Sequence, residues 1–458
     1  MSESGTTLPR GPRAPGLPRP GAFAVPPASG AGRHARESIG TWRALVRSFA
    51  ALAVGDVAAR LPGIAAILLL ARRLEPGGFG MAMIGVTLIF WFSLVVDAGT
   101  ETISTRDISR RPERLREIAD PVLGLRLALS VGAMALLGVA TWVAADGADR
   151  TLLLLFTLVL PASALNLRTM VLGVGARTAV GLGNVFSQLL FLAGVAALVR
   201  GAHDVRWVPV LKAAGELGNA AVILAALRPR FGLVRPRLDL GAWRAMLRDS
   251  LPLFGNGLAR AVMFSSSVFL VGSLLGRQDV GLYSAAHRPV VFAAGVTGLL
   301  LVSFLASYSA AGPADSARMF HRTVWVGAAT IPLALAVSAA SGPLVRLVYG
   351  PSYTPAAPTL ALLVWVVPVL LIGGPYGLVL IAANHQGTLL RNNVLGAVFT
   401  LVGTLTAVPA VGIVGAAAVA VAAQTLVAVL NYRTSVGRGL APRLGAVLHA
   451  LPGAIRNP

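Results

Sequence analysis

The sequence predicts an all-α membrane protein with about twelve transmembrane helices, arranged as two lobes of six. Three observations support this fold class. Of the 458 residues, 55% are hydrophobic and only 12% are charged, which is about half the charged fraction of a soluble domain. Apolar stretches recur along most of the chain, each long enough to cross a hydrocarbon core of roughly 30 Å as a helix. The connections between them are short, with no inserted soluble domain.

The apolar stretches define the predicted spans in chain order. Their edges are set only to within a few residues, because periodicity locates a helix better than it locates its ends. The spans are predicted at 48–70, 79–98, 121–144, 151–172, 179–199, 207–227, 251–275, 281–307, 323–347, 359–383, 389–409 and 412–432.

Basic residues are distributed unevenly between the two sets of loops. With the N-terminus in the cytoplasm, the cytoplasmic segments hold 26 arginine and lysine residues, and the external loops hold 7. Cytoplasmic loops of membrane proteins are enriched in these residues, so we expect both termini to be cytoplasmic. Lys212 is the only lysine among 39 basic residues, which indicates a GC-rich bacterial genome. The expected location is therefore the bacterial cytoplasmic membrane.

Composition also excludes several classes of partner. The formal net charge is +21, but the arginines stand in short segments between apolar runs rather than on one basic face, so no nucleic-acid partner is indicated. The chain has no cysteine, and so neither a disulfide framework nor a thiolate metal site. We expect no metal and no cofactor.

The spans divide into two halves flanked by two tails. Residues 1–44 are rich in proline, glycine, alanine and arginine, and they are predicted to be a disordered cytoplasmic tail, either solvated or resting on anionic headgroups. The first six spans occupy 45–228 and the last six occupy 250–434. A basic cytoplasmic linker, 229–249, joins the halves, and a cytoplasmic tail follows at 435–458.

Both halves carry the same short pattern. Residues 55–60 read GDVAAR and residues 255–260 read GNGLAR, and a later turn in each half reaches Gly80 or Gly281. Because each half has an even number of spans, the repeats are predicted to be parallel, related by an axis along the membrane normal. Transporters built from such repeats bind their substrates between the halves, near the midplane.

Longer motifs carry a resemblance to a known family. ARRLEPGGFG follows the first span and VVDAG ends the second, while the second half contains VGLYSAAHR, LVYGPSYTPAAPTLALL and AVPAVGIVGAA. In order and spacing these motifs resemble the polysaccharide-export flippases of the MOP superfamily, over residues 45–434. One departure is Glu75, which stands where that family often has a glycine in the turn after the first span.

The resemblance implies a transporter rather than an enzyme. Such flippases move polyprenyl-pyrophosphate-linked oligosaccharides from the cytoplasmic to the outer leaflet by alternating access, for export of lipopolysaccharide or exopolysaccharide. The implied partners are the lipid-linked glycan, membrane lipids, and a coupling proton or sodium ion.

Three other functions remain open. An ion-coupled antiporter of drugs or small molecules, from the same superfamily, is disfavoured by a cationic cavity. A lipid II flippase usually carries two further spans. A membrane-embedded glycosyltransferase or glycan polymerase needs acidic catalytic residues or a large external loop, and neither is evident here.

Arginines inside the predicted spans mark the candidate substrate site, because a charge near mid-bilayer costs at least about 2.5–3.5 kcal/mol. Arg260 follows Asn256 by four residues and so has no carboxylate partner on its own helix. Arg60 holds the matching place in the first half. The two are predicted to line one central cavity from opposite lobes. A guanidinium can hold phosphate oxygens through parallel N–H donors, which suits a pyrophosphate.

Three further arginines are substrate-binding candidates with open alternatives. Arg288, two turns into the eighth span, either extends the site outward or reaches the outer headgroups. Arg126 and Arg168 lie near cytoplasmic span ends, where each either snorkels to the headgroups or receives the pyrophosphate from the inner leaflet.

The carboxylates within or beside the spans are expected to pair locally. Asp56 stands four residues before Arg60, so it either forms an ion pair on the same helix face or binds the coupling ion. Lys212 and Glu216 repeat this spacing and are predicted to pair. Asp97 and Glu101, at the end of the second span, are expected to pair with Arg106.

Overall fold

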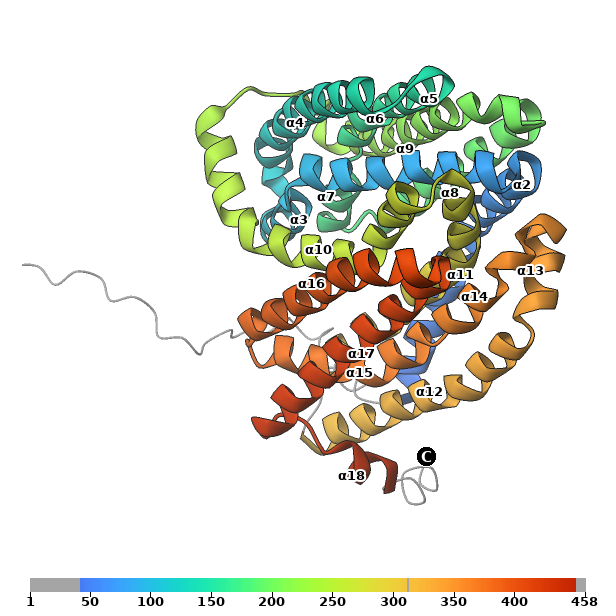
Figure 1. Cartoon of the computed structure of the whole chain (residues 1–458). Helices are drawn as coiled ribbons and strands as arrows, with labels where there is room; N and C mark the ends of the chain where they lie inside the picture. The colour runs from blue at the N-terminus through green and yellow to red at the C-terminus, as the bar shows by residue number, and fades with distance from the viewer. Residues whose placement is uncertain (1–41, 311–312, 450–458) are drawn as a thin grey trace, which may run out of the picture.

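The computed structural model describes the backbone of residues 42–310 and 313–449, and within these ranges the chain forms helices without any strand (Figure 1). The predicted disordered tail, up to residue 41, and residues 450–458 lie outside this description. The helices are α2 (Trp42–Asp97), α3 (Thr100–Arg110), η1 (Pro112–Arg114), α4 (Leu115–Ala144), α5 (Gly147–Thr157), α6 (Val159–Ala164), α7 (Arg168–Gly173), α8 (Arg177–Leu198), η2 (Ala202–Arg206), α9 (Trp207–Phe231), α10 (Leu240–Leu274), α11 (Arg277–Ala310), α12 (Pro313–Ala339), α13 (Ser341–Tyr349), η3 (Pro351–Ala356), α14 (Ala357–Leu363), α15 (Val366–Ala382), α16 (Gln386–Val411), α17 (Ile413–Gly437) and α18 (Leu444–His449).

Eleven segments of the described chain are long and apolar enough to cross a membrane. The first, Ala59–Asp97, lies in α2, which turns back on itself at Glu75 (Figure 1). Its two arms, 42–74 and 76–97, are each long enough to cross a core of roughly 30 Å at about 1.5 Å per residue. Counted by arms, the described chain has twelve segments of membrane-spanning length, and the predicted all-α polytopic fold class is confirmed.

The turn in α2 depends on an unusual backbone conformation. Glu75 has φ 58° and ψ 172°, a region that is occupied almost only by glycine because a Cβ atom is crowded there. Pro76 follows, and its fixed φ suits the first turn of the second arm. The glycine that the resembling family often has at this place is therefore explained by the geometry of the turn.

The helices form two lobes. We call α2–α9 the N-lobe and α10–α18 the C-lobe; in Figure 1 the teal and green helices of the N-lobe lie above the orange and red helices of the C-lobe. At the boundary α2 packs along α11. Phe79 of α2, Tyr283 of α11 and Tyr353 of η3 belong to one buried apolar cluster. The largest core of the molecule therefore crosses the boundary between the lobes.

Two glycines allow the lobes to approach closely, and they do so reciprocally. A Cβ atom on Gly80 would overlap the carbonyl oxygen of Arg277, and one on Gly281 would overlap the carbonyl oxygen of Pro76. Each glycine thus packs on the residue four positions before the other. A reciprocal contact of this kind is what a two-fold relation between matching surfaces produces, here within a single chain.

We call this close contact at Gly80 and Gly281 the glycine crossing. Hydrogen bonds also join the lobes near it. The Arg72 guanidinium donates to the carbonyl oxygens of Val348 at 2.8 Å and Leu347 at 2.6 Å. The Tyr353 hydroxyl donates to the carbonyl oxygen of Ala71 at 2.8 Å. The guanidinium of Arg72, which comes from α2, thus lies beside the last turn of α13. A cation is favoured there by the partial negative charge of the helix end.

Two predicted spans run past the end of a helix in the structure. One is 323–347, because α12 ends at Ala339 and α13 begins at Ser341; the other is 151–172. The sequence predicts a continuous helix at 151–172, but the membrane-spanning segment here is Gly147–Ala164, and a separate short helix, α7, follows after a break. Asn166 lies at the break, and its side-chain oxygen accepts a hydrogen bond from the Arg168 backbone N–H at 3.2 Å. An asparagine that bonds the backbone in this way competes with the helix.

Candidate functional site

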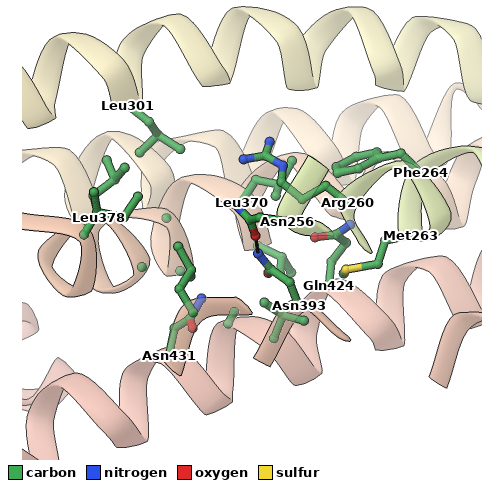
Figure 2. Close-up of a pocket in the computed structure, with 18 residues that line it drawn as sticks. Asn256, Arg260, Met263, Phe264, Leu301, Leu370, Leu378, Asn393, Gln424 and Asn431 are labelled. Atoms are coloured by element: carbon green, nitrogen blue, oxygen red, sulfur yellow. Dashed lines mark hydrogen bonds between the residues drawn. The ribbon is translucent and has the colours of Figure 1, made fainter. Parts of the chain in front are cut away.

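A cavity of about 180 Å³ lies within the C-lobe, walled mainly by α10, α15, α16 and α17 (Figure 2). It is smaller than the roughly 300–1,000 Å³ of a typical small-molecule site, so it has room for part of a large ligand rather than for the whole of it. Three glycines of α15 keep one wall free of side chains. The polar lining comprises one arginine and four amide side chains: Arg260, Asn256, Asn393, Gln424 and Asn431.

Arg260 supplies the only charge in the described lining of this cavity. It lies on α10, and its side chain is exposed toward the cavity space (Figure 2). No carboxylate lines the cavity, and Arg260 forms no ion pair within the described part of the chain. A guanidinium without a carboxylate partner in an enclosed space favours an anionic ligand.

The amide side chains around Arg260 hold one another in place. Asn393 donates to the side-chain oxygen of Asn256 at 3.0 Å. Asn392, just behind the wall, donates to the side-chain oxygen of Asn431 at 2.9 Å. Each bond uses one donor of an amide and leaves others available. The cavity therefore offers fixed neutral donors and acceptors beside one positive charge.

Arg60 does not share this cavity. Its Nη1 atom lies against Gly295 of α11, 3.2 Å from where a Cβ atom would stand. The two arginines therefore lie in different surroundings. The Asp56 side chain lies outside the described residues.

Arg288 lines a second cavity, of about 140 Å³, at the boundary between the lobes. It reaches from α11 into a space walled by α2, α8 and α9, where Lys212 and Gln188 also face. Its Nη2 atom donates to the Met83 sulfur at 3.2 Å. A thioether is a weak acceptor, so a stronger anionic acceptor can displace it. Arg288 thus extends into the protein rather than toward headgroups.

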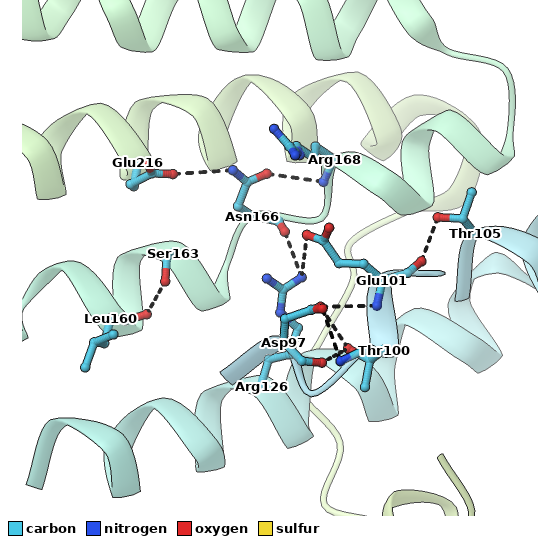
Figure 3. A network of polar contacts seen from close by, with 11 residues as sticks. Asp97, Thr100, Glu101, Thr105, Arg126, Leu160, Ser163, Asn166, Arg168 and Glu216 are labelled. Carbon is cyan, nitrogen blue, oxygen red and sulfur yellow. Dashed lines mark hydrogen bonds and ion pairs between the residues drawn. The ribbon is translucent and has the colours of Figure 1, made fainter. Parts of the chain in front are cut away.

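A network of polar contacts connects the ends of several N-lobe helices (Figure 3). The Arg126 Nη1 atom donates to the carbonyl oxygen of Asn166 at 3.0 Å and lies 3.8 Å from a Glu101 oxygen. The Asn166 amide donates to Glu216 at 3.4 Å. Glu216 in turn accepts from Lys212 at 2.9 Å. The predicted Lys212–Glu216 ion pair is therefore confirmed.

The carboxylate of Glu101 is partly buried within this network. Burial and then the nearby Asp97 carboxylate raise the pKa of Glu101 above its ordinary value, while Arg126 and Arg168 act in the opposite direction. Asp97 caps the start of α3, accepting a hydrogen bond from the Glu101 backbone N–H at 3.1 Å. The site holds two carboxylates close together, a situation in which one binds a proton readily.

The structure contradicts one alternative and one expectation for this region. Arg126 does not snorkel to headgroups, because its residue is only 5% exposed and its guanidinium faces Glu101 and Asn166. Arg106 pairs with the adjacent Asp107 at 2.9 Å rather than with Asp97 or Glu101. Glu101 belongs to α3 and Arg126 to α4, so the packing of these two helices brings the guanidinium beside the carboxylate, and Glu101 faces inward. Arg168 contributes positive charge near Glu101 from α7.

The neutral part of the C-lobe cavity was missed at the level of sequence. Gln424 stands within an apolar run, and Asn393 and Asn431 stand at the edges of two others; an amide in such a place was the available signal. They come from two helices, α16 and α17. Nothing in the sequence places them opposite Arg260, because that depends on how these helices pack against α10.

The fold of the chain is similar to that of transporters of the MOP superfamily. A multidrug resistance MATE family transporter in an inward-facing conformation superposes with a TM-score of 0.62 at 14% identity, over 86% of this chain and 96% of its own. Lipid II flippase MurJ, in an inward closed conformation, gives a TM-score of 0.65 at 12% identity, over 88% and 90%. A MOP transporter from Pyrococcus furiosus, described as having a binding pocket of reversed polarity, gives 0.56 at 16% identity, over 88% and 95%.

The sequence itself is more specific. Residues 45–305 match the polysaccharide biosynthesis protein family, and the chain belongs to that family. No curated protein matches the chain in a sequence search. The resemblance drawn from the motifs is therefore confirmed. The three solved structures above are at most 16% identical to the chain, so they support the fold alone.

Proposed function

We propose that this protein is a flippase that moves a polyprenyl-pyrophosphate-linked oligosaccharide from the cytoplasmic to the outer leaflet of the bacterial cytoplasmic membrane, for export of a cell-surface polysaccharide. Both termini face the cytoplasm, and the two lobes alternate in access. Membership of the polysaccharide biosynthesis protein family and a MOP-type transporter fold support a transport role without covalent chemistry.

The observation that carries the proposal is the cationic C-lobe cavity. Arg260 faces a cavity that has no carboxylate in its described lining and is otherwise lined by amides and apolar side chains. An anionic pyrophosphate needs compensating positive charge in this depth of the membrane, and the planar guanidinium matches two of its oxygens. The amides suit the hydroxyl groups of an attached sugar, since both kinds of group donate and accept.

Arg288 is a second contact for the anion in this scheme. It comes from the C-lobe helix α11 but faces a cavity walled by N-lobe helices, together with Lys212. An anion bound there is held by groups from both lobes. Arg60, Arg126 and Arg168 remain candidates for earlier contacts with the substrate, and Asp56 remains a candidate for binding a coupling ion.

The cavity also bears on the competing antiporter function. A cationic drug or a metal cation is repelled by an arginine and attracted by carboxylates. The C-lobe cavity contains an arginine, and its described lining contains no carboxylate. This supports an anionic substrate over a cationic one.

The direct test is export in a bacterial strain that lacks its own flippase. Arg260→Ala should reduce surface polysaccharide at least tenfold per molecule of protein in the membrane, because the charge and both forked donors are lost. Arg260→Lys should restore only part of the activity, because a lysine retains the charge without the fork. Surface glycan is measured by antibody and membrane protein by blotting.

The control is an arginine away from both cavities. Arg150→Ala removes a half-buried guanidinium that pairs with Asp146 at 3.0 Å, so export should stay near the wild-type level. Wild-type export by Arg260→Ala would show that the cavity arginine does not hold the substrate.

A further inference from the structure

The connection between the lobes carries an exposed face that the transport function does not use. We call residues 232–239 the linker strap; it follows α9 and leads into α10. The Arg235 backbone N–H donates to the Asp120 carboxylate at 3.0 Å, and the Arg237 backbone N–H donates to the Asp120 carbonyl oxygen at 3.0 Å. These bonds fix the strap against α4 of the N-lobe.

The first turns of α10 are fixed in the same way. The Trp243 indole N–H donates to the carbonyl oxygen of Pro121 at 2.9 Å, and Met246 packs against a buried cluster that includes Val122. The Asp239 side chain accepts from the Ala242 N–H at 3.0 Å and caps the helix. One side of this helical segment is therefore committed to the protein.

The opposite side of the segment is exposed and has a regular composition. Positions 240, 244, 247 and 251 of α10 are spaced by four, three and four residues and so lie on one helix face, and position 248 lies beside them, four residues after 244. We call this the interfacial face: Leu240, Arg244, Leu247, Arg248 and Leu251. Leu240 is 77% exposed and Leu251 is 65% exposed. Leu238, just before the helix, is 82% exposed.

The segment lies where a membrane surface must be. It connects two membrane-spanning segments, Ala202–Phe231 and Phe254–Leu274. In Figure 1 the first turns of α10 run along the left edge of the molecule, across the ends of neighbouring helices. A helix in this place, with leucines and arginines on its outer face, rests with the leucines in the acyl boundary and the arginines at the phosphates.

The charges on this face are not used within the protein. Arg235, Arg244 and Arg248 are exposed and form no ion pair with any described carboxylate. The nearby Asp239 is occupied as a helix cap and lies 3.7 Å from Arg237. Three guanidinium groups thus remain available beside exposed leucines.

We propose that the interfacial face, with Arg235 of the strap, is a binding site for anionic phospholipids of the leaflet that it touches. The arginines hold the lipid phosphates and the leucines contact the upper acyl chains. Because the strap is bonded to the N-lobe and α10 begins the C-lobe, such lipids lie at the only covalent connection between the two. The same helix carries Arg260.

The site is tested with purified full-length protein in a neutral detergent. Phosphatidylglycerol or phosphatidylcholine is added, and native mass spectrometry counts the lipids retained. The wild type should retain phosphatidylglycerol in preference. Arg244→Gln with Arg248→Gln should weaken that preference by about fivefold per arginine, the factor that corresponds to roughly 1 kcal/mol per basic residue at a membrane surface.

Two matched variants keep the result interpretable. Arg200→Gln with Arg206→Gln removes two exposed arginines before α9, at its opposite end from the strap, and should leave the preference intact. Arg244→Lys with Arg248→Lys retains the charges and should keep most of it. Equal retention of the two lipids by the wild type, or an unchanged preference in the double glutamine variant, overturns the proposal; so does an equal loss in the Arg200 and Arg206 variant.

Discussion

At the scale of single residues, this protein places charge where apolar surroundings make it costly. Arg126 is almost fully buried, and its Nε atom has no acceptor in the described structure. Glu101 lies 3.8 Å from its Nη1 atom, which is too long for a strong hydrogen bond. The two therefore attract each other without forming a tight bidentate pair. The Glu101 carboxylate is left with incomplete compensation for its burial.

This geometry predicts a pH dependence of stability. Burial and Asp97 raise the pKa of Glu101 in the folded protein, so the folded state binds this proton more tightly than the unfolded chain does. The free energy of unfolding should therefore decrease as pH rises from the ordinary glutamate pKa through the raised value. Glu101→Gln should reduce the dependence of the thermal midpoint on pH across this window, with the midpoint measured between about pH 4 and 8.

The control lies on the same helix. Asp107 is exposed and pairs with Arg106 at the surface, so Asp107→Asn should leave the slope as in the wild type. A wild-type slope in Glu101→Gln would assign the pH dependence to another group. The charged groups that face Glu101 are Asp97, Arg126 and Arg168.

At the scale of elements, the turn in α2 shows how one residue sets the path of a helix hairpin. The chain reverses at Glu75 between two membrane-spanning arms. Glutamate occupies a backbone conformation that suits glycine, and such a position costs on the order of 1–3 kcal/mol. The surrounding contacts, including the glycine crossing five residues later, hold the turn in place.

Glu75→Gly should therefore stabilise the protein. Removal of the Cβ atom relieves most of that strain, so we expect a gain of about 1 kcal/mol, reduced by the greater freedom of glycine in the unfolded chain. The measurement is the thermal midpoint in detergent. Glu75→Ala removes the carboxylate but keeps the Cβ atom, and it should give no gain. Equal stabilisation by both variants would assign the effect to the charge.

At the scale of the whole molecule, the lobes contact each other most closely near the turn of α2. The glycine crossing, the Arg72 hydrogen bonds to α13 and the Tyr353 hydrogen bond to Ala71 lie in the same region. Under the proposed alternating access these contacts must separate when the molecule opens at this end. The buried apolar cluster that holds Phe79, Tyr283 and Tyr353 must come apart there as well.

The proposed orientation places this region on the outer side of the membrane. A cysteine at Ser352, exposed in η3, should react with an impermeant thiol reagent in intact cells, whereas one at Ser109, exposed in α3, should react only after the cells are opened. The native chain has no cysteine, so no background labelling arises. The reverse pattern would place both termini outside.

The sequence by itself determined the fold class, the approximate spans and the family, because these depend on local properties. Apolar runs specify helices of membrane length wherever they pack, and the motifs stand in fixed order along the chain. The Lys212–Glu216 pair was also predictable, since residues four apart meet on any helix.

Tertiary structure alone decided which charged groups share a cavity. Arg60 and Arg260 looked equivalent in the sequence, yet Arg60 lies against Gly295 of α11 whereas Arg260 lines the C-lobe cavity. Arg288 reaches a cavity of the opposite lobe, and Glu101 meets Arg126 from another helix. Which residues meet between helices depends on the rotation and register with which the helices pack, and a membrane span is apolar on most of its circumference, so its periodicity does not specify either.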